Sequence, residues 1–453
     1  MHVRSSRDRS SRLLDFLRTE EASGVFLLGA TVVALIWANS PLRESYESLW
    51  STVATVEIGG LDIGMDLQNW VNEGLMTLFF LVVALEVKRE VTTGELRDPK
   101  TAALPIIAAI GGMVVPAGVY LLLNAGSDTA GGWGIPVATD IAFALGVLTL
   151  AASRAPVSLR SFLLTLAIVD DIGAILLIAV FYSGGLAAGW LVVAAVIVSS
   201  AFLARLLRVT SVVPYVLLGI GLWIALYESG VNPTLAGVVL GLMAPAVPLR
   251  RSPTPAIEGH QTLIAAENTP DEEAEAYWIA VDNMAKKAVS PLDRVETSLH
   301  PWTSRIVVPT FALANAGIEV SATTLSETVT SPLGLGVLLG LVVGKPLGIG
   351  AAVWAATRAR IGRLPDGVSP RMVFGVAALA GVGFTVALFI AELAFGSPRD
   401  VEVAKLAVLL ASLLASVFGA VILRSAHRPQ HGYLEGTAGR EGLRRGHADR
   451  RFT

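Results

Sequence analysis

The sequence predicts an all-α integral membrane protein with twelve transmembrane helices and a small external β-hairpin. The 453 residues are 53% hydrophobic and only 16% charged, whereas soluble proteins average about 25% charged residues. The mean hydropathy is +0.64. Apolar residues gather in runs of about 20, which is the length that crosses a bilayer core. Composition and run length together indicate a polytopic membrane protein.

The predicted organisation has five parts. These are a cytoplasmic N-tail (1–20), helices 1–8 (21–249), a cytoplasmic loop (250–295), helices 9–12 (296–424) and a cytoplasmic tail (425–453). The first apolar run leads directly into further membrane sequence, so it is interpreted as helix 1 and not as a signal peptide. The predicted spans lie near 22–38, 70–87, 102–124, 134–150, 158–182, 188–204, 211–227, 231–248, 303–321, 332–356, 372–395 and 401–424.

The distribution of basic residues supports this topology. With both termini inside, 29 of the 34 Lys and Arg residues fall in segments that face the cytoplasm. Only Arg43 and Arg399 fall in external loops. Basic residues are retained on the cytoplasmic side of membranes, and one missed helix would reverse every later loop. The split therefore favours twelve spans with both termini cytoplasmic.

Three segments outside the spans have their own patterns. In the external loop 41–68, VEIGGLDIGMDL alternates apolar and polar residues around Gly59-Gly60, which predicts a short β-hairpin. In the cytoplasmic loop, Thr269-Pro270-Asp271-Glu272 has the pattern of a capping box with Pro at the first helical position. A short amphipathic helix is expected there. The C-terminal tail is rich in Arg, Gly and His and is predicted to be disordered.

Several classes of function are disfavoured by what the sequence lacks. There is no cysteine, so disulfides and thiolate metal sites are excluded. The six histidines form no cluster at ligand spacing, which argues against a structural zinc site. No Walker loop or dinucleotide fingerprint is present. We therefore expect a transporter and not an enzyme, with no cofactor, no nucleic-acid partner and no ATP-driven pump within this chain.

The candidate functional centre is the pair Asp170-Asp171 in LAIVDDIGAILL, which lies in the middle of the fifth span. A charge at that depth costs roughly 3 kcal/mol or more. Adjacent residues on a helix point about 100° apart, so the two carboxylates form a broad acidic sector that must face protein or water. A polar contact between helices would explain a lone Asn or Ser, but two carboxylates at mid-membrane favour an ion or proton site.

Two further polar sites lie at the same predicted depth. Thr139-Asp140 follows Pro136 in the fourth span, where a weakened helix could free backbone groups to contact an ion; an ordinary proline kink is the alternative. Lys345 lies near the centre of the tenth span and is expected to pair with a carboxylate. Glycines at 336, 340, 344 and 348 predict a smooth ridge for close helix packing on the same span.

The fourth and eleventh spans are both predicted to be interrupted. Pro136 weakens the fourth, and Gly381 and Gly383 in AGVGFT weaken the eleventh. They are the middle members of helices 3–5 and 10–12, and interrupted segments at corresponding places in two halves indicate an inverted repeat with the substrate site between them. Broken-helix ends carry partial charges, which Asp140 and Lys345 could compensate.

Eight motifs in the order of the chain resemble the NhaA-type sodium/proton antiporters. They are LEVKRE at 85–90, TDIAFALG at 139–146, AIVDDIGA at 167–174, SGVNPTLAG at 229–237, LHPW at 299–302, FALANAG at 311–317, GKPLG at 344–348 and GVGFT at 381–385. The resemblance covers about residues 20–250 and 292–425. It implies twelve helices with two crossed, unwound ones, an inverted repeat, and a homodimer joined partly through the external hairpin.

The resemblance also implies roles for individual residues. Asp171 and Asp170 match the ion and proton site, Thr139 and Asp140 match the crossing of the unwound helices, and Lys345 matches the partner of Asp170. Glu86 and Glu296 match a cytoplasmic funnel that is linked to the pH response.

The chain departs from the family pattern at three places that bear on pH. Asn232-Pro233 stands where a well-known bacterial member has a pH-responsive His, and Asn does not titrate near neutrality. Thr297 replaces another His just before LHPW, and the insertion 250–292 has no counterpart in that member.

These observations predict a pH-regulated antiporter of the bacterial inner membrane that exchanges Na⁺, and Li⁺, for protons in sodium and pH homeostasis. Small hard cations prefer carboxylate, hydroxyl and carbonyl oxygens, which Asp170, Asp171 and Thr139 offer. The alternatives are a sodium-coupled symporter of an organic solute, which needs additional polar groups in the spans, and an ion channel, which needs a continuous wet path.

Overall fold

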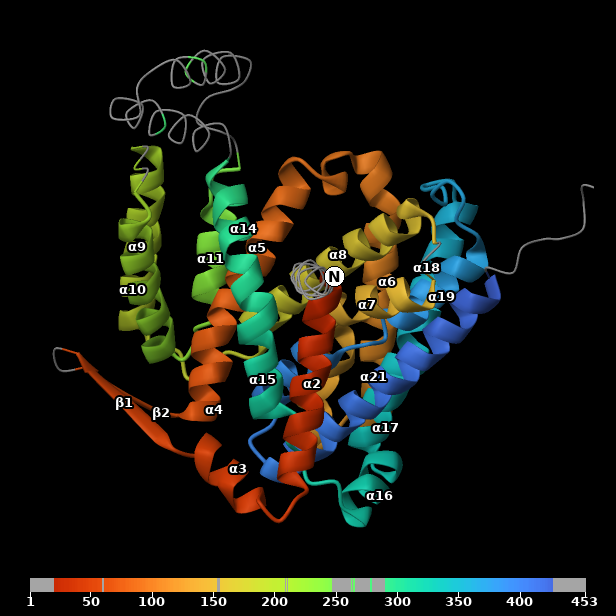
Figure 1. Ribbon diagram of the computed structural model, residues 1–453, viewed down its shortest axis with the longest axis horizontal. Helices are drawn as coiled ribbons and strands as arrows, with labels where there is room; N and C mark the ends of the chain where they lie inside the picture. The colour runs from red at the N-terminus through yellow and green to blue at the C-terminus, as the bar shows by residue number, and fades with distance from the viewer. Residues whose placement is uncertain are drawn as a thin grey trace, which may run out of the picture.

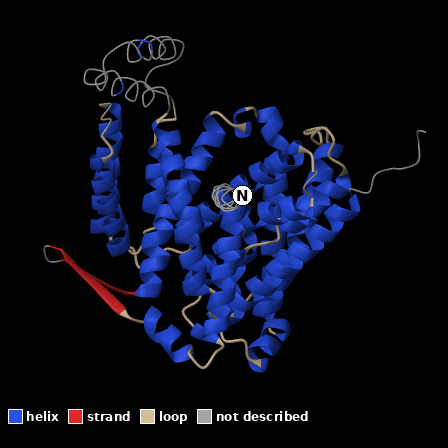
Figure 2. Cartoon of the chain, in the orientation of Figure 1, coloured by secondary structure: helices blue, strands red, loops and turns tan. Residues whose placement is uncertain are grey.

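The structure is a computed structural model that describes residues 20–58, 61–152, 155–207, 209, 211–246, 262, 264, 278 and 290–426. The amphipathic helix predicted in the 250–295 loop and most of the two predicted tails lie outside the described residues. Helices packed side by side form the body, and a two-stranded hairpin projects from one end of it (Figures 1 and 2).

The bounds of the described elements follow the apolar runs. The first half contains α2 (Glu20–Ala38), α3 (Arg43–Trp50), β1 (Val53–Ile58), β2 (Leu61–Asp66), α4 (Leu67–Asn69), α5 (Met76–Thr92), α6 (Pro99–Asn124), α7 (Ile141–Ala151), α8 (Val157–Phe181), α9 (Ala188–Leu206), α10 (Val213–Ser229) and α11 (Leu235–Met243). The second half contains α14 (Pro291–Trp302), α15 (Val308–Asn315), α16 (Ala322–Thr330), α17 (Pro332–Leu339), α18 (Lys345–Arg358), α19 (Pro370–Leu379), α20 (Phe384–Ala394) and α21 (Pro398–Ala426).

Short segments of other helical types interrupt or extend these helices. Three are π-helical turns: η1 (Trp70–Leu75), η4 (Thr303–Val307) and η5 (Gly340–Gly344). Two are 3₁₀ segments: η2 (Glu95–Arg97) and η3 (Asp128–Val137). Short π-helical and 3₁₀ segments within helices often mark functional or strained sites. The η5 segment ends directly before Lys345.

Six of the described helices are long and apolar enough to cross a membrane, and up to nine spans result if each bent helix pair counts as one. The six are Leu67–Thr92, Pro99–Asn124, Val157–Phe181, Ala188–Leu206, Pro332–Arg358 and Pro398–Ala426. This length and apolar character, repeated along the chain, is typical of a multi-pass membrane protein.

Two spans are broken where the sequence predicts it. The axes of η3 and α7 differ by 47° across residues 138–140, and those of α19 and α20 by 46° across residues 380–383. Asp140 ends the first break because its side chain accepts the Phe143 N–H and caps α7. Gly381 allows the second break to approach its neighbours, since a Cβ there would lie 2.4 Å from Leu341 O.

The ends of the molecule differ from the sequence prediction in detail. The predicted external loop 41–68 contains α3, which packs Tyr46 against Trp37 with a ring separation of 5.5 Å. The predicted hairpin is confirmed, with Val53 opposite Asp66 and Ile58 opposite Leu61. The helix predicted at 303–321 begins earlier, at Pro291, because Ser290 caps α14 by accepting the Asp293 N–H.

The predicted glycine ridge on α17–α18 lies against α6. A Cβ on Gly348 would stand 2.1 Å from Gly111 O, and one on Gly344 would stand 2.9 Å from Pro116 Cα. Only glycine permits this backbone contact. The contact brings Lys345, which lies between these two glycines, into the interior beside η3.

Candidate functional site

The two helix breaks meet in the middle of the molecule. The Asp140 N–H donates to Val382 O at 2.7 Å, and the Thr139 hydroxyl lies 2.9 Å from Ala380 O. Each break therefore supplies hydrogen-bond partners for backbone groups that the other leaves without helical partners. Irregular backbone at this depth requires such partners, because lipid offers none.

Asp140 serves the N-termini of both broken helices. One carboxylate oxygen accepts the Phe143 N–H of α7 at 2.9 Å, and the other accepts the Thr385 hydroxyl of α20 at 2.6 Å and the Thr385 N–H at 3.3 Å. Two helix N-termini thus share one buried acidic group, which the positive ends of helix dipoles favour. The geometry agrees with the predicted compensating role of Asp140.

Asp170 and Lys345 form a fully buried ion pair. Lys345 Nζ lies 2.9 Å from Asp170 Oδ2, and both side chains are 0% exposed. Lys345 also donates to Val137 O, the last carbonyl of η3. Its charge therefore lies at the negative end of one broken helix, where a cation is favoured. The structure brings Lys345 and Asp170 into contact, which is the pairing that the resemblance implies.

One carboxylate oxygen of Asp170 makes no hydrogen bond among the described residues. The Thr139 hydroxyl lies 2.7 Å from Asp170 Oδ2, the same oxygen that Lys345 contacts. Asp170 Oδ1 is buried and has no hydrogen-bond partner among the described residues. An unpaired buried carboxylate oxygen is costly, so its retention agrees with a group that is held ready for a cation or a proton.

Asp171 directly follows Asp170 on α8. It is 6% exposed, and no hydrogen bond within the described part of the chain involves its carboxylate. It is close enough to Asp170, Asp140 and Glu86 to interact with their charges. Carboxylates this close titrate as a unit, and a cation between them would reduce their repulsion.

The two predicted pH-response residues lie on facing helices. Glu86 on α5 is 4.0 Å from His300 Nε2 on α14, and Glu296 on α14 pairs with Arg89 on α5. Glu296 precedes the predicted span and is 6% exposed. Burial raises the pKa of Glu296, the charge of Arg89 lowers it, and Asp293 raises it further.

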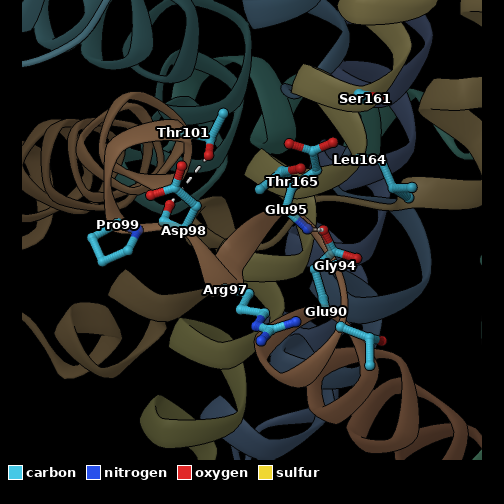
Figure 3. A pocket seen from close by; sticks show the side chains of 11 residues that line it. Glu90, Gly94, Glu95, Arg97, Asp98, Pro99, Thr101, Ser161, Leu164 and Thr165 are labelled. Atoms are coloured by element: carbon cyan, nitrogen blue, oxygen red, sulfur yellow. Dashed lines mark hydrogen bonds between the residues drawn. The ribbon is translucent and has the colours of Figure 1, made fainter.

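A cavity of about 710 Å³ opens at the same end of the molecule (Figure 3). It lies between the end of α5, the start of α6 and the α8 helix that carries the aspartate pair. Its lining is mostly acidic and hydroxyl-bearing: Glu90, Thr93, Gly94, Glu95, Arg97, Asp98, Pro99, Thr101, Ser161, Leu164 and Thr165. Such a lining can attract cations toward α8.

Two of the three departures from the family pattern, Asn232 and Thr297, lie among the described residues. Asn232 is buried, and its side-chain oxygen accepts the Thr234 N–H at 3.0 Å just before α11. This is a turn-forming contact that needs no titration. Thr297 is exposed on α14, one position after Glu296.

The sequence did not single out every polar contact of the site. Thr385 was assigned to the helix break alone, yet its hydroxyl binds Asp140 from 245 positions away. The backbone acceptors Val137 O and Ala380 O have no signature in side-chain identity. The only sequence signal for this contact was the position of Thr385 at the end of GVGFT. Thr385 follows the second helix break, as Asp140 follows the first.

Fold and site together define a class: a multi-pass membrane protein in which charged groups meet where two broken helices cross. Comparison with known proteins identifies the family within this class. The family model described as Na⁺/H⁺ antiporter 1 matches residues 14–423. The chain therefore belongs to the Na⁺/H⁺ antiporter 1 family.

Similar proteins cover nearly the whole chain. The protein called Na(+)/H(+) antiporter NhaA in Oleidesulfovibrio alaskensis is 47% identical over 420 residues, which is 90% of this chain and 92% of the relative. Na(+)/H(+) antiporter NhaA 3 of Frankia alni is 44% identical, covering 90% of this chain and 88% of its own length. Na(+)/H(+) antiporter NhaA 2 of Myxococcus xanthus is 43% identical, with 94% and 93% covered.

Proposed function

We infer that this protein is a secondary active transporter that exchanges Na⁺ for H⁺ across a membrane. The observation that carries the inference is the buried constellation of Asp170, Asp171 and Lys345 at the crossing of two broken helices. Family membership points to the same exchange. Buried ionisable groups at membrane depth are retained for ion or proton transport.

The proposed Na⁺ site consists of Asp170, Asp171 and Thr139. The unpaired Oδ1 of Asp170, the carboxylate of Asp171 and the Thr139 hydroxyl supply only oxygen ligands, which suit a small hard cation such as Na⁺ or Li⁺. Asp140 takes part by holding the two N-termini in place. A roomy polar cavity for an organic solute is not needed for this chemistry.

The proposed mechanism is a competition for the carboxylates. In the absence of Na⁺, protons either neutralise the two carboxylates or charge Lys345, which then pairs with ionised Asp170. When Na⁺ binds Asp170 and Asp171, it displaces the protons and weakens the contact with Lys345, since two cations at one carboxylate repel each other. One site that holds either Na⁺ or protons couples their movement in opposite directions.

The proposed architecture is twelve helices with an inverted repeat. The first triple is α6, η3–α7 and α8, and the second is α17–α18, α19–α20 and α21. Breaks of 47° and 46° in the middle members of the two triples support the repeat. We call the remaining spans, including α2, α5 and α15, the surrounding helices. Access to the site alternates when the triples move against the surrounding helices.

The proposed setting is the bacterial inner membrane, with both termini cytoplasmic. The distribution of Lys and Arg supports this orientation and puts the Glu86–Glu296 region inside, where it can respond to cytoplasmic pH. A homodimer joined through the hairpin is also proposed. Val53 and Val56 on β1 are 66% and 41% exposed, and an exposed apolar strand edge suits pairing with a second copy.

Replacement of Asp171 by Asn tests the function. Asp171→Asn keeps the side-chain volume and removes the charge and the proton site, so the protein should insert normally while Na⁺-driven proton movement in proteoliposomes disappears. Asp62→Asn, an exposed substitution on β2, is the matched control and should exchange normally. Near-normal exchange by well-folded Asp171→Asn would refute the site, and a requirement for an organic solute would refute antiport.

A further inference from the structure

A second buried polar cluster lies at the boundary between the second triple and the surrounding helices, at the end of the molecule that carries the hairpin. We call it the outer cluster, and it consists of Gln68, Asn72, Asn315, Glu392 and Lys405. Lys405 on α21 pairs with Glu392 on α20, and the Lys405 side chain is only 7% exposed. Asn315 and Asn72 are 1% and 5% exposed.

The contacts of the outer cluster cross the boundary that must open in alternating access. Gln68 on α4 donates to Glu392 on α20 at 2.9 Å, and Lys405 on α21 donates to Asn315 on α15 at 3.4 Å. Within the surrounding helices, Gln68 also contacts Asn315 at 3.1 Å. The ion pair of Glu392 and Lys405 belongs to the second triple. The amide side chains that contact this pair, those of Gln68 and Asn315, belong to the surrounding helices.

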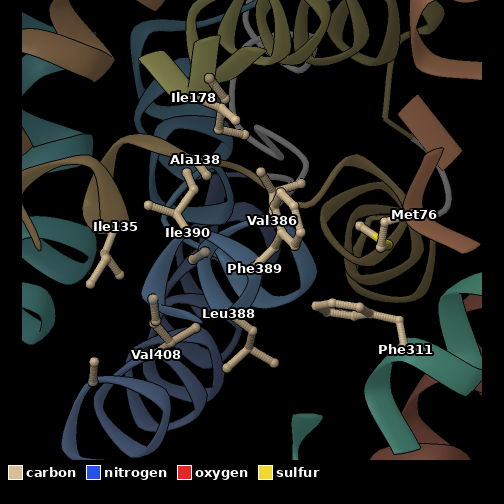
Figure 4. Close-up of a cluster of buried hydrophobic side chains, with 14 of the residues drawn as sticks. Met76, Ile135, Ala138, Ile178, Phe311, Val386, Leu388, Phe389, Ile390 and Val408 are labelled. Carbon is tan, nitrogen blue, oxygen red and sulfur yellow. The ribbon is translucent and has the colours of Figure 1, made fainter. Parts of the chain in front are cut away.

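An apolar layer separates the outer cluster from the ion site. On α20, Phe389 lies one turn after Thr385, which binds Asp140, and one turn before Glu392. Its ring centroid is 5.5 Å from that of Phe80 on α5 and 6.3 Å from that of Phe311 on α15. Figure 4 shows Met76 and Phe311 across from Phe389 within this layer.

The facing helix repeats the same order. Gln68, Asn72, Met76 and Phe80 follow one another at four-residue spacing along α4, η1 and α5, so they lie along one side of that span. From the ion site toward the hairpin end, both sides of the boundary therefore present apolar side chains first and polar side chains second. Met76 and Phe389 are both 0% exposed.

We propose that the outer cluster is the gate that closes the ion path at the hairpin end, with Glu392 and Lys405 as its positioning residues. The proposal rests on the proposed exchange. In the structure the contacts of the cluster join the two sides of the boundary at the hairpin end, while the cavity lined by Glu90 and Ser161 lies at the other end of α5. Opening at the hairpin end breaks the contacts of Gln68 and Asn315 with the ion pair, and water then replaces these contacts.

The chain is well suited to a test because it contains no cysteine. A single reporter cysteine at position 76, Met76→Cys, lies behind the gate and should react slowly with a membrane-impermeant maleimide added from the hairpin side. Adding Glu392→Gln weakens the gate and should raise the labelling rate at least fivefold. Glu327→Gln, which removes the exposed partner of Arg399 at the same end, is the matched control and should leave the rate unchanged.

A second reporter distinguishes gating from loss of structure. Ser161→Cys lines the cavity at the opposite end, so its labelling should slow when Glu392→Gln shifts the protein toward the state open at the hairpin end. A merely destabilised protein would label faster at both positions, and that result would overturn the proposal. Gln68→Leu removes one boundary contact without leaving an unpaired charge, and it should change both rates in the same directions as Glu392→Gln.

The outcomes separate the gate from the function. If the Met76→Cys parent fails to exchange Na⁺ for protons while Ser161→Cys also fails, the proposed function is wrong. If these parents exchange normally and neither Glu392→Gln nor Gln68→Leu changes either labelling rate, the gate is wrong and the exchange stands.

Discussion

Breaking the Lys345–Asp170 pair should destabilise the protein as well as stop transport. Both side chains are 0% exposed at a separation of 2.9 Å, and removing one partner of a buried pair costs about 3–5 kcal/mol because the other charge remains without compensation. Lys345→Met keeps most of the side-chain volume, so nearly all of its loss should come from the stranded Asp170 carboxylate. Lys345→Ala should lose more, since it also leaves a cavity.

The double variant Asp170→Asn with Lys345→Met tests the pairing. Asn can still accept the Thr139 hydroxyl, and no buried charge remains, so the double variant should recover about 1–3 kcal/mol relative to the sum of the single losses. Recovery stays partial because Val137 O loses its Lys345 donor. Thermal unfolding of purified protein, followed by the fluorescence of its nine tryptophans, measures the single variants Asp170→Asn, Lys345→Met and Lys345→Ala and the double variant. Strictly additive losses would refute the pairing.

Three other substitutions or deletions test the rest of the site. Thr385→Val removes the hydroxyl that binds Asp140, so it should cost about 1 kcal/mol of stability and slow exchange. Thr330→Val at the surface should do neither. Normal transport by Thr385→Val would show that the contact between the two broken helices has no role in exchange. Arg89→Gln removes the charge that lowers the pKa of Glu296, so Glu296 should ionise at higher pH. The rise of exchange activity with pH should therefore move to higher pH. An unchanged profile of activity against pH would exclude Glu296 from the pH response. Deleting residues 256–288 removes seven carboxylates and two lysines but spares Ser290, the cap of α14. The deletion should shift the pH midpoint of activity to lower pH at low salt but not at high salt. Equal midpoints for the deleted and full-length proteins at low salt would show that the loop is a passive linker.

The sequence was sufficient for the main features of the fold and site because burial and membrane depth restrict them strongly. Apolar run length located the long apolar helices that the structure describes, and glycine and proline located both breaks. A carboxylate partner for Lys345 was predictable because an unpaired lysine at that depth is too costly to persist, whereas Asp170 was identified as that partner only by the resemblance to the family.

The remaining features depend on contacts between distant parts of the chain. Thr385 reaches Asp140 across 245 positions, and Gln68 reaches Glu392 across 324. Side-chain identity alone does not indicate which polar groups meet. The early start of α14 at Pro291 was missed because its sequence is polar, although the Ser290 cap was present to be recognised.

The backbone contact between α6 and α18 has a mechanical consequence. At Gly111 and Gly348 the two main chains approach so closely that neither helix can slide, tilt or rotate past the other without a steric collision. This contact joins the two proposed triples through their backbones, and we expect them to move as one unit against the surrounding helices. A single added methyl group at Gly348 would collide with the backbone of Gly111, and the displacement of α18 would misalign the two broken helices.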